Sequence, residues 1–172
     1  MKVIEDFLSK EQFDLIQSAF MGPYFPWYYN SNVNPAVYGD DDPSLFRYQF
    51  THRIFWDQEI GGTGKDDSPF FRIIEPCLQR LGVQRLIRIK ANLTPRTVFH
   101  REMSGYHIDV SLPGKTSILY INTNNGYTQF KNGDKVKSVA NRMVTFDSQK
   151  LHSGISCTNQ KMRVVLNFNY DI

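Results

Sequence analysis

The sequence predicts a mainly β protein of the α+β class, a sandwich or barrel with N-terminal helices packed on one sheet. From residue 84 onward, short β-rich runs alternate with Gly, Pro and Asn turns almost to the C-terminus. Helical patterns occur only in the lead-in, residues 1–83, and helices that precede a run of strands commonly pack on one sheet of the strand domain. The 172 residues suit one domain, 1–172, because no repeat or linker divides them.

A first helix is predicted to begin after Ser9. Ser9 and Gln12 have the spacing of a capping box, and a stripe of apolar residues between 7 and 20 gives the helix a buried face. The pattern stops at Gly22, which a proline follows. The next segment, residues 24–43, is rich in aromatic residues. We expect these to pack over the core, with a lid over a pocket entrance as the alternative.

A strand and a second helix are predicted next. Residues 45–56 are β-rich and alternate between apolar and polar. The glycines at 61–64 indicate a flexible turn rather than a phosphate loop, since no Lys-Ser/Thr pair follows, and residues 57–67 are a second candidate lid. Ser68 as N-cap and Pro69 as first residue start the helix, and Gly82 ends it.

The remainder of the chain is expected to form a core of nine short strands. They are predicted at residues 84–93, 96–100, 105–110, 116–122, 127–130, 135–139, 142–146, 152–157 and 162–170. This number of short strands at regular spacing indicates a sandwich or barrel.

Composition excludes several classes of protein. The net charge is +3, but Lys and Arg are scattered, which makes a nucleic-acid partner unlikely. No apolar stretch is long enough to span a membrane and the N-terminus does not resemble a signal peptide, so a cytoplasmic protein is expected. Cys77 and Cys157 have no metal-site spacing and are expected to be reduced, buried thiols.

The most informative motif is His107-Ile108-Asp109. On a strand, His107 and Asp109 would face the same side, and an inward carboxylate needs a partner because burying it unpaired is costly. A metal ion is one partner; an arginine or backbone N–H groups are the alternatives. His152 lies between two later strands and would complete a set of two His and one carboxylate, the ligand set of non-haem Fe(II) oxygenases. Taken alone, His152 is as well explained by a surface turn.

The last predicted strand contains Arg163, which shares a face with Val165, Asn167 and Asn169. The opposite face is apolar and would pack on the helices. A guanidinium facing a polar cavity suits the carboxylate of an organic acid that chelates the same metal, whereas a surface ion pair is the simpler alternative. Tyr120 is expected to point into the same cavity. A rim of the cavity, or more simply a solvated edge, would be formed by Arg88, Lys90, Arg96, His100 and Arg101.

Together these motifs resemble those of a known family. His107-x-Asp109, His152 and Arg163, with Leu-Tyr-Ile-Asn at 119–122 and Gly-x-Thr-x-Phe at 126–130, are similar to the Fe(II)- and 2-oxoglutarate-dependent dioxygenases, most closely the prolyl-4-hydroxylase-like branch. The resemblance covers about half of the chain, residues 84–170. The run at residues 139–147 is similar to that of short phage or bacterial members of the family. The resemblance implies a double-stranded β-helix, a jelly-roll of two facing sheets with the metal at its mouth.

The resemblance also implies roles for single residues. His107, Asp109 and His152 match the triad that binds Fe(II), and Arg163 and Tyr120 match the residues that hold the distal carboxylate of 2-oxoglutarate. These roles depend on the resemblance and not on the spacing alone.

This chain departs from the family pattern at two places. The family often has a Tyr near the iron-chelating end of the co-substrate, but residues 90–95 contain none, so Asn92 and Thr94 are the candidates for that contact. A tryptophan common near the end of the last strand is replaced by Asn169.

The implied reaction consumes O₂ and 2-oxoglutarate, releases succinate and CO₂, and hydroxylates a C–H bond, with ascorbate as a stimulant. The expected substrate is a peptidyl prolyl-type residue, or else a small molecule. The alternatives are a jelly-roll module that binds a metal or ligand without turnover, a structural sandwich protein of a virion, and a nucleic-acid dealkylase on the same fold. Arg163 favours the enzyme, because a simple metal-binding module needs no carboxylate anchor.

Overall fold

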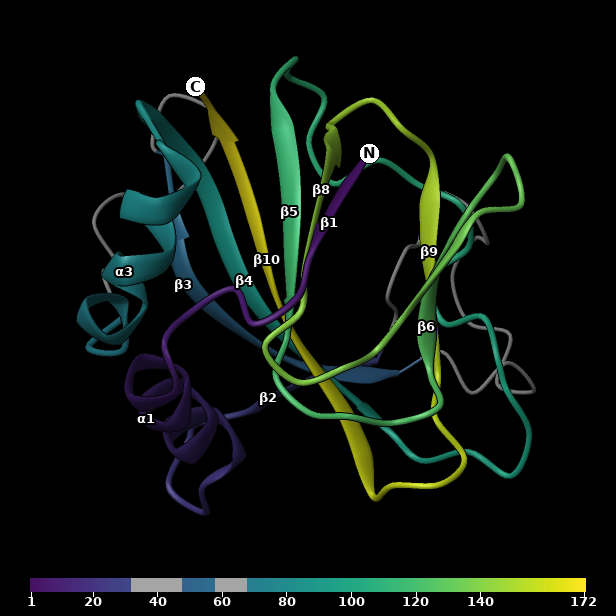
Figure 1. Ribbon diagram of the computed structural model, residues 1–172. Coiled ribbons are helices and arrows are strands. Elements are labelled where there is room, and N and C mark those ends of the chain that lie inside the picture. Colours follow the sequence, from purple (N-terminus) through teal and green to yellow (C-terminus); the bar gives the residue numbers. More distant parts are fainter. Residues whose placement is uncertain (32–47, 58–67) are drawn as a thin grey trace.

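Two antiparallel sheets face each other in the computed structural model, which describes residues 1–31, 48–57 and 68–172 (Figure 1). The larger sheet has the strand order β1-β8-β5-β10-β4-β3-β2 and the smaller one β7-β6-β9. The larger sheet consists of β1 (Lys2–Ile4), β2 (Tyr28–Asn30), β3 (Gln49–Trp56), β4 (Arg85–Pro95), β5 (Lys115–Tyr120), β8 (Met143–Asp147) and β10 (Met162–Asp171). The smaller sheet consists of β6 (Tyr127–Phe130), β7 (Lys135–Lys137) and β9 (His152–Ile155). The predicted mainly β class is therefore confirmed.

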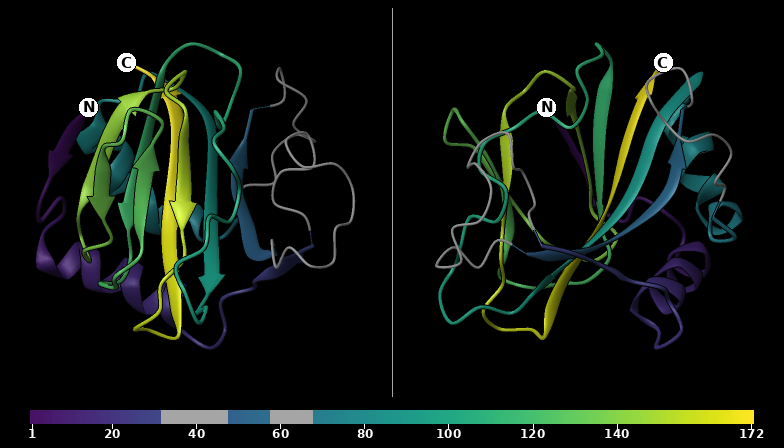
Figure 2. Two further views of the ribbon diagram at one scale, coloured as in Figure 1. Left: turned by 90° about the vertical axis from the view of Figure 1, so that its right-hand side faces the viewer. Right: turned by 180° about the vertical axis from the view of Figure 1, so that it is seen from behind.

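Two helices, α1 (Lys10–Met21) and α3 (Phe71–Leu81), lie on the side of the larger sheet that faces away from the smaller one (Figures 1 and 2). The capping box predicted for α1 is present: the Gln12 amide donates to Ser9 Oγ at 3.3 Å, and the Ser9 amide donates to the Gln12 side chain at 3.4 Å. Gly82 ends α3 in the left-handed region, with φ of 68°.

The predicted start of α3 is wrong by a few residues. Phe70, not Ser68, is the N-cap, and it makes no side-chain capping bond. Ser68 instead stabilises a turn before the helix, since its Oγ accepts from the Phe70 amide at 3.3 Å and its carbonyl accepts from Phe71 at 2.8 Å. Ser68 Oγ also lies 2.7 Å from Nε2 of His52, and this pairing with a neighbouring strand was not visible in the local sequence.

Strand β10 separates the two environments of the core. One face of the strand packs with the helices in a large apolar cluster, and the other faces the smaller sheet. The apolar cluster contains Val164, Leu166 and Phe168 of β10 together with Phe13, Ile16 and Phe20 of α1 and Ile74 and Cys77 of α3. Figure 2 shows the smaller sheet on the other side of these strands. The face that contains Arg163, Asn167 and Asn169 is thus the inner one.

The inner face of the larger sheet is apolar on one half and polar on the other. Strands β5 and β8 contribute apolar side chains that pack with the smaller sheet. This second cluster consists of Ile118, Tyr120, Phe130, Val136, Val144, Phe146 and Val165. Strand β4, which β10 separates from β5, instead presents Arg88, Lys90, Asn92 and Thr94 to a cavity. The smaller sheet has three strands opposite seven and therefore leaves this part of the larger sheet open to the cavity. We call it the polar floor.

Several strand predictions need correction. Residues 96–100 and 105–110 are not strands; the second segment touches β9 only through an isolated bridge between His107 and His152. The three-residue strands β1 and β2 were not predicted, because so short a run has no detectable alternation. The predicted strand 45–56 is β3, although residues 45–47 lie outside the described part of the chain.

The aromatic loop is described only in its first part. Phe25 is 5% exposed and packs against Phe20, Trp27 and Phe70, in agreement with the expected packing over the core. For Tyr24, Tyr28 and Tyr29 that expectation is wrong, because all three are exposed. The rest of this candidate lid, and the turn predicted at 61–64, fall in residues 32–47 and 58–67, outside the described residues.

Two further expectations concern the cysteines and membranes. Cys77 and Cys157 are both free and buried, as predicted, and burial raises the pKa of Cys77 to about 12. Within the described ranges, every helix is too short or too polar to cross a bilayer.

Asn141 fixes the N-terminal segment to the turn before β8. It adopts a positive φ of 62°, its side chain accepts from the Leu8 amide at 2.9 Å and donates to the Leu8 carbonyl at 2.8 Å, and its carbonyl accepts from Phe7 at 2.8 Å. Phe7 and Leu8 belong to the apolar cluster, so this turn holds a part of the core in place.

We expect Asn141→Ala to lower the free energy of unfolding by about 3 kcal/mol, because two buried hydrogen bonds are lost and Ala is strained at positive φ. Asn141→Gly keeps the backbone conformation accessible and should cost less. Urea denaturation measures both variants, with Asn132→Ala in an exposed turn as control. Equal losses for Ala at 141 and at 132 would contradict this account.

Candidate metal centre

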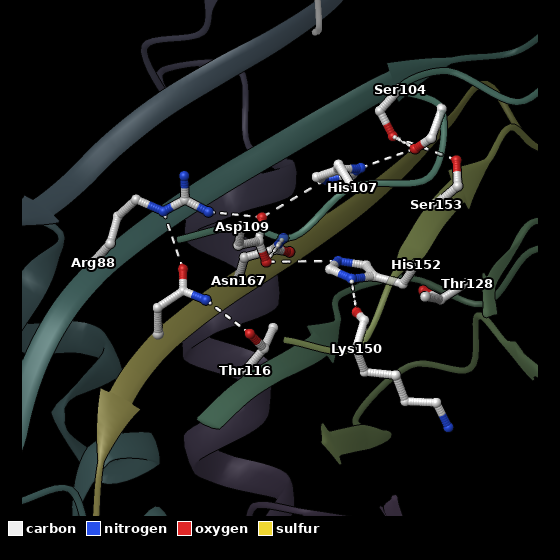
Figure 3. Close-up of polar contacts among 12 residues, drawn as sticks. Arg88, Ser104, His107, Asp109, Thr116, Thr128, Lys150, His152, Ser153 and Asn167 are labelled. Atoms are coloured by element: carbon white, nitrogen blue, oxygen red, sulfur yellow. Dashed lines mark hydrogen bonds and ion pairs between the residues drawn. The ribbon is translucent and has the colours of Figure 1, made fainter. Parts of the chain in front are cut away.

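The side chains of His107, Asp109 and His152 converge beside a cavity that residues of both sheets line (Figure 3). Their potential ligand atoms all lie within 4.8 Å of one another. Nε2 of His152 is 3.6 Å from Asp109 Oδ2, and Nε2 of His107 is 3.9 Å from Asp109 Oδ1. The side chains are sheltered, with 24%, 5% and 3% exposure for His107, Asp109 and His152. The structure therefore brings the three predicted ligands together.

Both imidazoles present the same nitrogen to the centre. Nδ1 of His107 donates to the Gly105 carbonyl at 2.9 Å, and Nδ1 of His152 donates to the Lys150 carbonyl at 3.1 Å. Because a carbonyl oxygen can only accept, Nδ1 is the protonated nitrogen in each ring. The Nε2 lone pairs are then directed toward Asp109, as in metal sites whose ligands are oriented by outer hydrogen bonds.

The local geometry of His107 and Asp109 differs from the prediction. The two residues were expected on one face of a strand, but they lie in an irregular segment beside β9. Two backbone hydrogen bonds join His107 and His152, at 3.0 and 3.1 Å, and Gly105 turns the chain just before them with a positive φ of 64°. A side-chain bond from Gln129 of β6 to the Tyr106 hydroxyl, at 2.6 Å, further anchors the segment.

Asp109 is held by a chain of side chains that crosses the larger sheet (Figure 3). Arg88 Nη2 donates to Asp109 Oδ1 at 2.7 Å, and Arg88 Nε donates to Asn169 Oδ1 at 3.0 Å. Asn169 in turn donates to Thr116 Oγ1 at 2.9 Å. Asn167 lies close to the other carboxylate oxygen, with 3.4 Å between Nδ2 and Oδ2. One oxygen of Asp109 is thus engaged by Arg88, and the second faces His152.

Electrostatics favours the protonation states that a metal requires. Burial by itself would raise the pKa of Asp109, but the Arg88 guanidinium and the two imidazoles outweigh it and hold that pKa well below the usual range. Burial lowers the pKa of His107, and the nearby Asp109 opposes this only in part. The carboxylate is therefore ionised and His107 is neutral at pH 7.

A cavity of about 450 Å³ extends from this centre across the polar floor. Asn92 and Thr94, the predicted candidates for the chelating end of a co-substrate, both line it and are buried. Oδ1 of Asn92 and Oδ1 of Asn167 are buried, and neither has a hydrogen-bond partner in the part of the chain that the structure describes. Buried polar atoms without partners are uncommon, so these atoms indicate a site for a polar ligand.

Arg163 also lines this cavity and is only 5% exposed. Its hydrogen-bond acceptors are the hydroxyls of Ser138, at 2.9 Å, and Thr128, at 3.1 Å. Within the described ranges no carboxylate lies within ion-pair distance of it. A Cβ at Gly126 would come within 2.8 Å of Arg163 Cδ, so glycine at 126 makes room for the side chain.

Tyr120 lies behind Arg163 rather than on the cavity wall. It is fully buried in the second apolar cluster, and its hydroxyl donates to Thr128 Oγ1 at 2.8 Å. The Arg163 guanidinium carbon is 5.6 Å from the centre of the Tyr120 ring. Tyr120, Thr128 and Arg163 therefore form one buried group, in which Thr128 and Arg163 reach the cavity.

The expected solvated rim divides in two. Arg96, His100 and Arg101 are exposed, as expected, but Arg88 is buried against Asp109 and Lys90 lines the cavity. Sequence reasoning thus missed the partner of Asp109. A signal was present, because Arg88, Lys90, Asn92 and Thr94 occur at every second position of one predicted strand and had to share a face.

The donor set fits a divalent metal of the iron type. Two imidazole nitrogens and one ionised carboxylate would hold the ion, and this is the ligand set of non-haem Fe(II) oxygenases. Mg²⁺ and Ca²⁺ prefer oxygen ligands and are poorly matched.

No protein-family model matches this sequence, and no curated protein matches it either. Solved structures do. A prolyl hydroxylase of Trichoplax adhaerens, in complex with a hypoxia-inducible-factor peptide, aligns with a TM-score of 0.62 at 15% identity, over 99% of this chain and 83% of that one. A 2OG-Fe(II) oxygenase family protein of Burkholderia pseudomallei aligns with a TM-score of 0.68 at 10% identity, over 98% and 84%.

A third similar structure is viral. The collagen prolyl hydroxylase of Paramecium Bursaria Chlorella virus-1 aligns with a TM-score of 0.55 at 10% identity, over 99% of this chain and 89% of that one. The chain therefore has the fold of 2OG-Fe(II) oxygenases, and the resemblance in the sequence is confirmed for the architecture.

We expect Arg88→Leu to weaken binding of Co²⁺ or Mn²⁺ by about tenfold, the usual effect of removing an outer partner of a metal ligand. The physical reason is that Asp109 loses the donor that orients its carboxylate. Calorimetric titration of the metal-free protein measures the affinity, and Arg101→Leu on the exposed segment is the control. Unchanged affinity in Arg88→Leu would assign Arg88 to folding alone.

His107 should titrate below its ordinary pKa of 6.5 in the metal-free protein. Because the pKa of His107 is lower in the folded protein, the unfolded chain takes up this proton at a higher pH than the folded chain does. The contribution of His107 to stability is therefore complete above about pH 6.5 and declines as the pH falls below it. An NMR titration of the imidazole signals, assigned with His107→Gln, measures the midpoint, and a value at or above 6.5 would refute the prediction.

Proposed function

We propose that this chain, as a single domain of residues 1–172, is an Fe(II)- and 2-oxoglutarate-dependent dioxygenase. It hydroxylates a C–H bond of a peptidyl, prolyl-type substrate and releases succinate and CO₂. The observation that supports this most strongly is a buried arginine, Arg163, that has no acidic partner among the described residues and lies in the same cavity as a cluster of two His and one Asp.

A buried guanidinium without a counter-charge is costly, and the cost is removed when an anion binds. The hydrogen-bond partners of Arg163 in residues 1–31, 48–57 and 68–172 are neutral hydroxyls, so it suits the distal carboxylate of a diacid. The Thr128 hydroxyl lies beside Arg163, where it can hydrogen-bond the same carboxylate, and the Tyr120 hydroxyl donates to Thr128 Oγ1 and holds it in position. In this proposal Arg163, Thr128 and Tyr120 orient one end of 2-oxoglutarate.

The other end of the co-substrate lies toward the metal centre. Asn92 and Thr94 line the same cavity, and in this proposal they are the candidates that hydrogen-bond the chelating carboxylate. His107, Asp109 and His152 would hold the iron. When bound, Fe(II) supplies the redox chemistry that couples O₂ and 2-oxoglutarate consumption to hydroxylation.

The protein's own contribution is orientation and exclusion of water. Arg88 keeps the Asp109 carboxylate ionised and fixed in direction. Ile118, Leu151 and Val165 line the cavity and give it apolar walls beside the polar floor. A peptidyl substrate is inferred from the similar prolyl hydroxylases, one of which is in complex with a peptide.

The test measures succinate formed from 2-oxoglutarate in the presence of Fe(II), O₂ and ascorbate, first without substrate and then with a panel of prolyl peptides. Mass spectrometry detects the gain of one oxygen. We expect slow succinate release without substrate, abolished in Asp109→Ala because one metal ligand is lost. Unchanged succinate in that variant would exclude the proposed enzyme.

Arg163→Met separates co-substrate binding from metal binding. We expect the 2-oxoglutarate concentration for half-maximal rate to rise by roughly two orders of magnitude, since a buried charge pair is broken. Co²⁺ affinity should stay nearly unchanged. A loss of Co²⁺ affinity instead would show that Arg163 supports the fold. Binding of Co²⁺ and 2-oxoglutarate by the wild type without any succinate release would favour a binding module without turnover.

A further inference from the structure

Lys90 occupies a distinct place on the polar floor. In the register of the sheet it lies opposite Asn167 of β10 on one side and Arg53 of β3 on the other. Asn167 in turn approaches Asp109, with 3.4 Å between Nδ2 and Oδ2. Lys90 is therefore in the same transverse row as the metal centre.

Lys90 is well separated from the proposed anchor of 2-oxoglutarate. Thr94, not Lys90, lies opposite Arg163 in the sheet, and the four-residue offset between Thr94 and Lys90 corresponds to about 13 Å along a strand. A short diacid that extends from Arg163 to the metal centre satisfies Arg163 and leaves Lys90 beyond its chelating end. Among the described residues, Arg163 and Lys90 are thus two separate cationic positions, one at the far end of the co-substrate and one in the row of the metal centre.

Lys90 also lies where two cavities meet. It lines the cavity of the metal centre and a second cavity of about 670 Å³ over β2 and β3. The second cavity is lined on its other sides by Tyr28, Thr51, His52, Arg53, Trp56, Ser68 and neighbouring residues. A molecule in the second cavity would reach the metal centre by passing Lys90.

The charge of Lys90 has no counterpart in the described part of the chain. No hydrogen bond or ion pair involves its ammonium group there, whereas the neighbouring Arg88 is paired with Asp109. Burial, Arg88 and Arg53 together lower the pKa of Lys90 to about 8, with Asp109 opposing them. A partly buried ammonium among cations is stabilised by an anion, so this position selects for negative charge.

The walls of the second cavity supply aromatic surface beside this charge. Tyr28 is 62% exposed, and Trp56 lies under the guanidinium of Arg53, 4.6 Å from its carbon to the ring centre. A ligand with a ring or an apolar body could pack there while its anionic group meets Lys90.

We propose that Lys90 is the anion-binding residue of the primary-substrate site, so that the substrate carries a carboxylate or phosphate group close to the C–H bond that is oxidised. This inference rests on the proposed function for the identity of the metal site. In a peptide, the group is an acidic or phosphorylated side chain, or a terminal carboxylate, next to the modified residue. Arg163 remains the residue that binds the co-substrate.

The test measures binding of three small probes to the full chain by calorimetry. Benzoate and phenyl phosphate are the carboxylate and phosphate probes, and benzamide is the neutral control of the same shape. Each is titrated into metal-free protein and then into protein loaded with Zn²⁺ and saturated with 2-oxoglutarate, so that Arg163 and the metal are occupied. The ratio of benzoate to phenyl phosphate affinity distinguishes the two anionic groups.

We expect at least one anion to bind the loaded wild type more tightly than benzamide, and Lys90→Met to weaken it by about tenfold, the effect of losing one charge-assisted contact. Lys90→Arg should retain most of the affinity, and Lys137→Met, an exposed lysine on β7, should change nothing. The affinity for 2-oxoglutarate should be equal in Lys90→Met and wild type.

Three results would overturn the proposal. The first is equal binding of anions and benzamide by the wild type, and the second is unchanged anion binding in Lys90→Met. The third is a loss of 2-oxoglutarate affinity in Lys90→Met, which would assign Lys90 to the co-substrate. Failure of the proposed function is seen separately, as absence of 2-oxoglutarate binding by the wild type while Lys90-dependent anion binding persists in the metal-free protein.

Discussion

The structure depends on how buried charge is compensated between the two sheets. Asp109 is the acid of the metal centre, and it lies among Arg88, Lys90 and two imidazoles. Arg163 is buried farther along the same cavity, and its partners among the described residues are hydroxyls. Buried charges are tolerated when they are paired, so the surplus of cations over acids among the described residues of this cavity favours an anionic ligand.

The fold tolerates these buried charges because its apolar side chains pack in two clusters away from the polar floor. The outer face of the larger sheet packs on α1 and α3, and the inner faces of β5 and β8 pack on the smaller sheet. These two clusters contain most of the buried apolar side chains, which leaves β4 and the inner face of β10 free to present polar groups. Because side chains alternate along a strand, one face of β10 packs in the apolar core while its other face presents polar groups to the cavity.

The centre itself is rigid through hydrogen bonds rather than through packing alone. Two carbonyl groups, of Gly105 and Lys150, set the orientation of the imidazoles, and the chain from Thr116 through Asn169 to Arg88 sets that of the carboxylate. Such outer partners commonly determine how well a metal is held. Three of them lie on β4, β5 and β10, and Gly105 and Lys150 lie in the segments before His107 and His152, so the arrangement of the site depends on several parts of the fold.

Local sequence determined much of this protein. Alternation and turn residues predicted most strands of the core, and the capping box at Ser9 and the glycine at 82 predicted helix ends, because these signals act over a few residues. The sequence also predicted the residues that converge at the centre, because His107, Asp109 and His152 together form a set of two His and one carboxylate.

Only the tertiary structure decided how these residues meet. The segment 105–110 is not a strand, and His107 reaches His152 through a single bridge and a turn at Gly105. The pairing of Arg88 with Asp109 and the isolation of Lys90 depend on the register of β4 against β10 and β3. Register and burial are properties of several strands together, so the sequence of one strand does not determine which of its charges find a partner.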